Sequence, residues 1–213
     1  LALGVMLGVY AARRYLSKSD AVISTLSLTL YSIPSFWLGL MLIILFSLNF
    51  GWFPTSGMVS FGLKPGMGIP YYLDVLRHLF LPALTFSLTM SIPAFMRMTR
   101  ASVAEVMTED YVLTARAKGL SENKVFMRHA LKNALVPIIT AAHVWISLAF
   151  SSTVVIETVF AWPGIGKLMF DSIAVRDYPV LMGVFIVVAI IVVSTGLIAD
   201  ILSAAIDRRI TLE

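Results

Sequence analysis

The 213-residue chain contains no cysteine, which excludes a disulfide framework, a thiol nucleophile and a thiolate metal site. Charged residues are also scarce, at 13%, whereas 59% of the residues are hydrophobic. A soluble core of this size could not bury so much apolar surface. Composition therefore predicts a protein of the lipid bilayer, as does the mean hydropathy of +0.90.

The chain also lacks the Gly-x4-Gly-Lys-Ser/Thr phosphate loop, so we expect no ATP site of the Walker type and no cofactor in this chain. The three histidines, His78, His129 and His143, are far apart and lack metal-ligand spacing. Only His143 falls inside an apolar segment, where it is either a packed neutral side chain or part of a transport pathway. The glycine-rich stretch 57–68 is interpreted as turns.

Long apolar runs dominate what is present. Bilayer hydrocarbon is about 30 Å thick, so a spanning helix needs about 20 apolar residues. Residues 21–50, 79–96, 134–156 and 180–204 approximately meet this length. The first apolar run, 1–12, is shorter, and we interpret it as the end of a truncated span, with one more segment expected before it. The prediction is an all-α polytopic helical bundle with five spans visible of six.

The basic residues indicate how the spans are oriented. Twelve of the sixteen Lys and Arg lie in the first loop, in a central insert (97–133) and in the C-terminal tail. The other four lie in the two loops predicted on the opposite side. Positive residues are retained on the cytoplasmic side, so the insert and the C-terminus are predicted to be cytoplasmic. The net charge of +4 therefore reports membrane topology, and we expect no nucleic-acid partner.

Glycine and proline mark special positions in the apolar segments. Gly4 and Gly8 form a small-xxx-small pair that either lets two helices approach closely or arises by chance in a glycine-rich run. Pro34 removes one backbone hydrogen bond from its span, which predicts a kink. That kink is either a hinge of the pathway or a packing feature.

The second outer loop, 157–179, contains Trp162 and Pro163 and then apolar residues at helical spacing from Ile165. This spacing predicts a short amphipathic helix at the membrane surface, which either gates the outer mouth or anchors at the interface. Glu157 and Asp200 lie near span ends and have no obvious partner in the sequence. A role for them as ionisable pathway groups stays open.

The central insert predicts two short helices. Thr108 and the acids after it are typical of a helix start, and Lys118 followed by Gly119 is typical of a helix end. Ser121 is then expected to cap a second helix that continues toward the membrane. A solvated loop is the plain alternative to a docking surface.

Five motifs together resemble a known family. Those in the insert are 111–121 (YVLTARAKGLS) and 128–137 (RHALKNALVP), and those elsewhere are 32–39 (SIPSFWLG), 155–166 (VIETVFAWPGIG) and 176–179 (RDYP). They resemble permease subunits of binding-protein-dependent ABC importers, specifically the dipeptide, oligopeptide and nickel branch. The resemblance covers essentially the whole chain and implies the type I importer transmembrane fold.

The chain departs from the general pattern of these permeases at two places in the insert. Residues 113–115 are Leu-Thr-Ala where the general loop has Glu-Ala-Ala, and residues 131–132 are Leu-Lys where it has Leu-Pro. The proline comes later, at Pro137. Both departures resemble the peptide branch.

The resemblance implies that the insert docks into a groove on a separate cytoplasmic ATPase. Ala115 and Gly119 are expected to allow close approach and Leu120 and Val125 to supply apolar contact, while basic side chains orient the partner. The residues expected at this contact are Ala115, Arg116, Ala117, Lys118, Gly119, Leu120, Val125 and Arg128. The candidates for a pathway or gate are Pro34, His143, Trp162 and Pro163.

The implied protein is not an enzyme; it forms half of a pathway for di- or oligopeptides in the plasma membrane. The implied partners are a second permease subunit, cytoplasmic ATPase subunits that bind ATP and Mg²⁺, an extracytoplasmic substrate-binding protein and the bilayer. Two other classes stay open: a secondary transporter or channel driven by an ion gradient, and a scaffold or receptor without transport. The first would show intramembrane charge pairs or inverted repeats, and the sequence shows neither.

Overall fold

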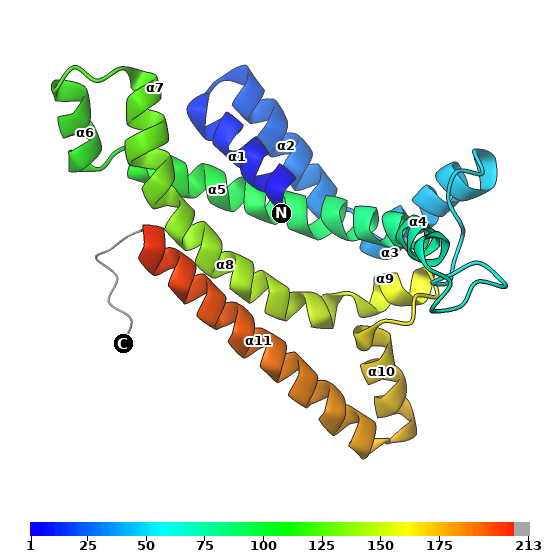
Figure 1. Cartoon of the computed structure of the whole chain (residues 1–213). Coiled ribbons are helices and arrows are strands. Elements are labelled where there is room, and N and C mark those ends of the chain that lie inside the picture. Colours follow the sequence, from blue (N-terminus) through cyan, green and yellow to red (C-terminus); the bar gives the residue numbers. More distant parts are fainter. Residues whose placement is uncertain (207–213) are drawn as a thin grey trace. The chain divides into compact units, whose positions relative to one another are not determined.

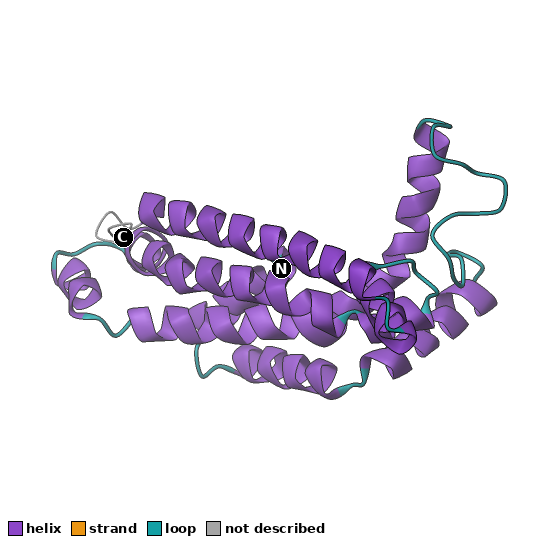
Figure 2. Cartoon of the chain, turned by 90° about the horizontal axis from the view of Figure 1, so that it is seen from below, coloured by secondary structure: helices purple, strands orange, loops and turns teal. Residues whose placement is uncertain are grey.

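A computed structural model describes residues 1–206 of the chain, so the expected cytoplasmic C-terminus, with Arg208 and Arg209, lies outside the described residues. Every regular element in this range is a helix, which confirms the all-α prediction (Figure 1, Figure 2). In chain order they are α1 (Ala2–Arg13), α2 (Lys18–Ser32), α3 (Ser35–Leu42), η1 (Ile43–Asn49), α4 (Ile69–Phe86), η2 (Ser87–Ser91), α5 (Ile92–Val106), α6 (Asp110–Ala117), α7 (Glu122–Lys124), η3 (Val125–Ala130), α8 (Leu131–Ser152), α9 (Val154–Val159), α10 (Ile165–Val175) and α11 (Tyr178–Ile206), where η denotes a π-helix.

Three continuous helical stretches in the described range are long and apolar enough to cross a bilayer: Ile69–Val106, Glu122–Phe150 and Tyr178–Ile206. A fourth is added if Lys18–Ser32 and Ser35–Asn49 are one interrupted span. The interruption falls at Pro34, where the sequence predicts a kink. α1 has only 12 residues and is shorter than a span.

The third predicted span, 79–96, lies inside a continuous helical stretch from Ile69 to Val106. The helix therefore extends beyond the predicted span at both ends, and it continues past Arg97 because a charged side chain does not end a helix. The three prolines Pro70, Pro82 and Pro93 do not break this stretch: Pro70 and Pro93 stand in the first turns of α4 and α5, and Pro82 lies inside α4.

The chain divides into two compact units. Within the described residues, the first consists of 1–31, 90–147 and 190–206, and the second of 32–89 and 148–189.

In the first unit, α1 lies directly along α5, and the two glycines of α1 make this close approach possible. A Cβ added to Gly8 would lie 2.6 Å from the carbonyl oxygen of Met96 and from the Cβ of Thr99. One at Gly4 would meet the backbone of Ile92 at 2.8 Å. The glycine pair therefore allows α1 and α5 to approach closely, which is the first of the two interpretations of the small-xxx-small pair.

The core of the second unit forms where α3, α4 and α9 meet. Leu42, Leu81, Ile156 and Phe160 are buried there together. Gly39 faces the Phe160 ring, with only 3.2 Å between an added Cβ and the nearest ring carbon. This core brings the motif at 32–39 against the motif at 155–166.

Candidate docking site

A polar protrusion in the first unit, defined here as residues 107–133, joins α5 to α8. It contains α6, α7 and η3, and Figure 1 shows α6 beside α7 with a loop connecting them. α6 ends where the sequence predicts, because Lys118 is the C-cap and Gly119 adopts φ +75°, a conformation that favours glycine. The amide of Gly119 donates to the carbonyl oxygen of Arg116 at 2.9 Å.

The start of α6 differs from the prediction. Glu109 occupies the N-cap position without a side-chain capping bond, and the hydroxyl of Thr108 instead donates to the carbonyl oxygen of Glu105 at 2.7 Å. Thr108 therefore extends the end of α5 and does not cap α6. Ser121 does occupy the N-cap position of α7, although its hydroxyl makes no capping bond.

The protrusion has a small apolar core of its own. Val112 and Val125 are fully buried and Ala115 is 5% exposed, and Val106 and Met107 pack against them. The side chains of Ala115 and Val125, two of the residues predicted to contact a partner, thus pack between the two arms of the protrusion. Burial follows from the turn at Gly119, which folds α7 and η3 back against α6.

An ion pair bridges that turn. The guanidinium of Arg116 contacts the carboxylate of Glu122 twice, Nε to Oε1 at 3.0 Å and Nη2 to Oε2 at 3.4 Å. An exposed pair of this kind contributes at most about 1 kcal/mol. The pair joins the last turn of α6 to the first residue of α7 across the turn at Gly119. Arg116, expected to face a partner, is already engaged within the protrusion.

Hydrogen bonds fasten the protrusion at its base and along α7. Asn133 Nδ2 donates to the hydroxyl of Tyr111 at 2.8 Å, and Nη2 of Arg13, the last residue of α1, donates to Asn123 Oδ1 at 2.9 Å. The Arg13 guanidinium also lies 5.8 Å from the centre of the Phe126 ring. The protrusion is therefore held from both sides and presents a defined surface.

That surface combines exposed apolar and basic side chains. Leu120 and Gly119 are exposed at the turn, and the space beside Gly119 is open for 4 Å around an added Cβ. Three exposed apolar residues, Tyr111, Leu113 and Met127, were not predicted as contacts, although two of them stand out as bulky residues in a polar helix. The predicted contact residues that the structure leaves exposed are Ala117, Lys118, Gly119, Leu120 and Arg128.

The four pathway or gate candidates lie at separate places. Pro34 is exposed at the break after α2, and His143 in α8 places Nδ1 3.0 Å from Thr195 Oγ1 of α11. Trp162 and Pro163 precede α10, with Trp162 half-buried and Pro163 exposed. A pathway role for any of them stays a prediction.

Glu157 has a partner that the sequence did not reveal. Its Oε2 accepts the backbone N–H of Lys167 at 2.5 Å, in the first turn of α10. Gly164, the N-cap residue, has no side chain to do this, and an added Cβ there would overlap the Glu157 carboxylate. The glutamate thus caps α10 from α9, and the amphipathic helix predicted from Ile165 is present.

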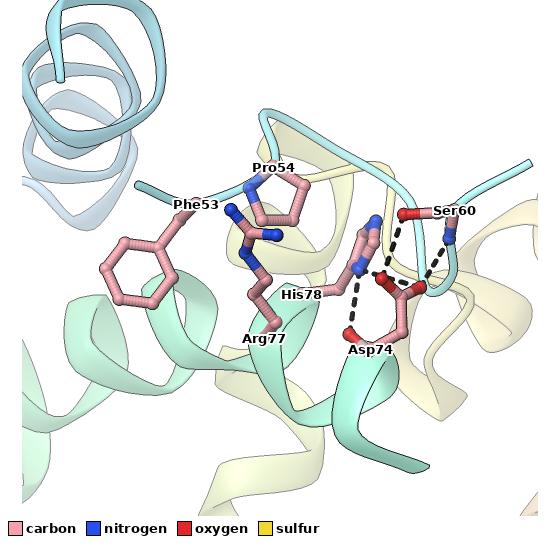
Figure 3. A pocket seen from close by; sticks show the side chains of 6 residues that line it. All are labelled: Phe53, Pro54, Ser60, Asp74, Arg77 and His78. Carbon is pink, nitrogen blue, oxygen red and sulfur yellow. Dashed lines mark hydrogen bonds and ion pairs between the residues drawn. The ribbon is translucent and has the colours of Figure 1, made fainter. Parts of the chain in front are cut away.

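A polar pocket of about 160 Å³ lies under the loop 50–68, which joins η1 to α4 (Figure 3). The carboxylate of Asp74 accepts the N–H of Ser60 at 2.6 Å and its hydroxyl at 2.9 Å. His78 Nδ1 lies 2.9 Å from the Asp74 carbonyl oxygen, and Arg77 donates to the carbonyl oxygen of Trp52. These bonds fasten the loop to α4. Across the described part of the chain, no cluster of three or more His, Asp and Glu has the geometry to hold a metal.

Together these features define a helical membrane domain with a compact polar protrusion. The chain belongs to the family of binding-protein-dependent transport system inner membrane components, whose sequence model matches residues 4–212. Family membership confirms the resemblance seen in the motifs and a multi-pass location in the inner membrane.

Among curated relatives, the oligopeptide transport system permease protein AppB of Bacillus subtilis (strain 168) is 42% identical over 210 residues, which are 99% of this chain and 65% of that protein. The di/tripeptide transport system permease protein DppB of Pseudomonas aeruginosa (strain UCBPP-PA14) is 41% identical, with 97% of this chain and 65% of that protein covered. The dipeptide transport system permease protein DppB of Escherichia coli (strain K12) is 36% identical, with 98% and 66% covered. The chain thus spans about 65% of the length of these relatives.

Proposed function

We propose that this chain forms one half of the translocation pathway of an ATP-driven importer for di- or oligopeptides. Two considerations support the proposal: the family to which the chain belongs, and relatives whose names state peptide transport. The proposed partners are a second permease subunit, separate cytoplasmic ATPase subunits and an extracytoplasmic binding protein that delivers the peptide.

The protrusion is the observation that carries the coupling step. Its arms share a buried core, an ion pair closes its turn, and hydrogen bonds fasten its base. A rigid element of this kind transmits displacement, whereas a solvated loop would absorb it. We propose that ATP-driven closure of the ATPase pushes on the turn at Gly119 and Leu120. Nucleotide then favours one state of the membrane helices over the other, which is a population shift.

Site-directed cross-linking tests this contact, and each introduced thiol is unique within these 213 residues because they contain no cysteine. Leu120→Cys, in the assembled importer in membranes, is treated with a thiol-directed photo-cross-linker. We expect a covalent product with the ATPase subunit. Val125→Cys is the matched control, because Val125 is fully buried in the same protrusion and gives no such product. Failure of Leu120→Cys to capture the ATPase would contradict the proposal.

The orientation of the protrusion is part of the proposal. Twelve of the sixteen basic residues lie on the side predicted to be cytoplasmic. A membrane-impermeant maleimide should therefore label Leu120→Cys in inside-out vesicles and not in right-side-out vesicles. Phe61→Cys, at a fully exposed position of the loop 50–68, which we propose lies on the outer side, should show the opposite pattern.

A further inference from the structure

A cavity of about 210 Å³ lies in the second unit beside Glu157. Its volume equals about seven water molecules in the liquid, below the range of about 300–1,000 Å³ that holds a drug-sized ligand. It therefore suits one terminal group of a larger molecule. Its walls come from α4, from α9 and from the loop before α10, and the lining residues are Leu79, Pro82, Ala83, Phe86, Thr153, Ile156, Glu157 and Trp162.

Among the described residues that line the cavity, Glu157 is the only acidic or basic one. Among the described residues, no Lys or Arg forms an ion pair with it; the neighbouring Lys167 Nζ contacts Asp171 Oδ2 at 2.6 Å instead. The N-terminus of α10 offsets part of the carboxylate charge through one N–H bond to Oε2. A negative charge among apolar walls is unfavourable without a cation, so the cavity favours a cationic occupant.

The remaining walls define which cation fits. The rings of Phe86 and Trp162 line the same cavity, and aromatic faces attract an ammonium group. Thr153 adds a polar residue to the lining, and the aliphatic residues favour a carbon chain next to the charge. A small hydrated metal ion would leave those apolar walls without contacts. The chemistry is that of a primary alkylammonium.

We infer that this cavity binds the N-terminal ammonium group of a peptide, with Glu157 as its counter-charge. The assignment of a peptide as the source of the ammonium group rests on the proposed function. Ammonium binding by the cavity does not depend on it, because the site is built from this chain alone. The capping bond to Lys167 holds the carboxylate in place, so one residue both fixes α10 and faces the cavity.

The test uses the assembled importer in phosphatidylcholine nanodiscs, without ATP, and compares two probes of the same shape. Binding of 3-methylbutylammonium and of neutral 3-methylbutan-1-ol is measured by saturation-transfer NMR. The ammonium should bind about tenfold more tightly than the alcohol. The preference is modest because the N-terminus of α10 already offsets part of the Glu157 charge. Glu157→Gln keeps an oxygen to accept the Lys167 N–H but removes the charge, so it should abolish the preference.

Asp177→Asn is the matched control. Asp177 Oδ1 also accepts a helix N–H, from Val180 at 3.2 Å, but this residue does not line the cavity. The control should keep the tenfold preference. Equal binding of the two probes by the unmodified importer, or a preference that survives in Glu157→Gln, would overturn the inference.

Competition identifies the source of the ammonium. Dileucine should displace 3-methylbutylammonium, whereas N-acetyl-dileucine should not. Displacement by N-acetyl-lysine and not by dileucine would overturn the assignment to the peptide N-terminus. None of these measurements requires transport, so the two proposals can fail separately. If the cavity does not bind ammonium groups, the two probes bind equally. If the chain is not part of an ATP-driven importer, ATP-dependent peptide uptake is absent.

Discussion

Asp20 in α2 and Arg100 in α5 form a bidentate ion pair in the first unit, with Nε 2.5 Å from Oδ1 and Nη2 2.8 Å from Oδ2. Asp20 is only 2% exposed, and it also accepts the backbone N–H of Leu16 at 2.9 Å. The Arg100 guanidinium lies 4.8 Å from the centre of the Tyr15 ring. The pair therefore fastens the connection between α1 and α2 to α5, the helix that leads into the protrusion.

Breaking this pair from one side should destabilise the first unit strongly. Arg100→Ala leaves the buried carboxylate of Asp20 without its partner, which costs about 3–5 kcal/mol for a buried pair. The measurement is chemical unfolding in detergent, with Arg97→Ala as the control. The Arg97 side chain lies over Tyr31 at an exposed position, so its removal should cost less than about 1 kcal/mol. Equal losses for the two variants would argue against a special role for the pair.

The approach of α1 to α5 should depend on Gly8. In Gly8→Ala the new methyl group meets the Met96 carbonyl oxygen at 2.6 Å, so the helices must separate, at about 1–3 kcal/mol. Gly183→Ala in α11 is the control, because apart from its own helix backbone no atom of the described residues lies within 4 Å of its Cβ position. Helix propensity predicts that this control is neutral or stabilised by up to about 1 kcal/mol. Thermal unfolding of the two variants in detergent gives the comparison.

Gly119→Trp should separate ATP hydrolysis from uptake. The substitution places a large side chain on the exposed turn of the protrusion, where a partner is proposed to approach. Membrane vesicles should show normal amounts of inserted protein and continuing hydrolysis, with dipeptide uptake reduced at least about tenfold, equivalent to 1.4 kcal/mol of coupling. Normal uptake by this variant would count heavily against the coupling role.

Gly62→Trp controls for backbone strain in that experiment. Gly62 has φ +90° and, like Gly119, no atom of the described residues within 4 Å of its Cβ position, but it lies in the loop between η1 and α4. Both substitutions thus force a side chain into the same left-handed region. Uptake should survive in Gly62→Trp. Equal loss in both variants would point to strain and not to a lost docking surface.

Removing the Glu157 side chain should loosen the start of α10. Glu157→Ala leaves the Lys167 N–H without its acceptor, and losing a helix cap costs about 0.5–2 kcal/mol. Hydrogen exchange at the Lys167 amide should become faster by the corresponding factor. Glu157→Gln retains an acceptor oxygen and should stay close to the unmodified protein. An unchanged exchange rate in Glu157→Ala would show that the cap contributes nothing.

Much of the protrusion was predictable because its signals are local. The glycine after Lys118 ends α6 since only glycine adopts φ +75° without strain, and that depends on residues adjacent in the chain. The surface roles were less predictable. Val125 and Leu120 are both apolar and five positions apart, yet one is fully buried and the other 37% exposed. The difference arises because η3 packs against α6, and the pattern of apolar residues within one helix does not show which other helix it packs against.

The amino-acid order alone determined the membrane class, the helical content, the break at Pro34, the turn at Gly119 and the family motifs, since composition and neighbouring residues govern these features. The tertiary structure decided which residues meet: Asp20 and Arg100 are 80 positions apart, and Glu157 reaches a helix that begins after it. Such pairs form because packing brings separate helices together. The number of residues between two positions in the sequence does not determine the distance between them in the folded protein.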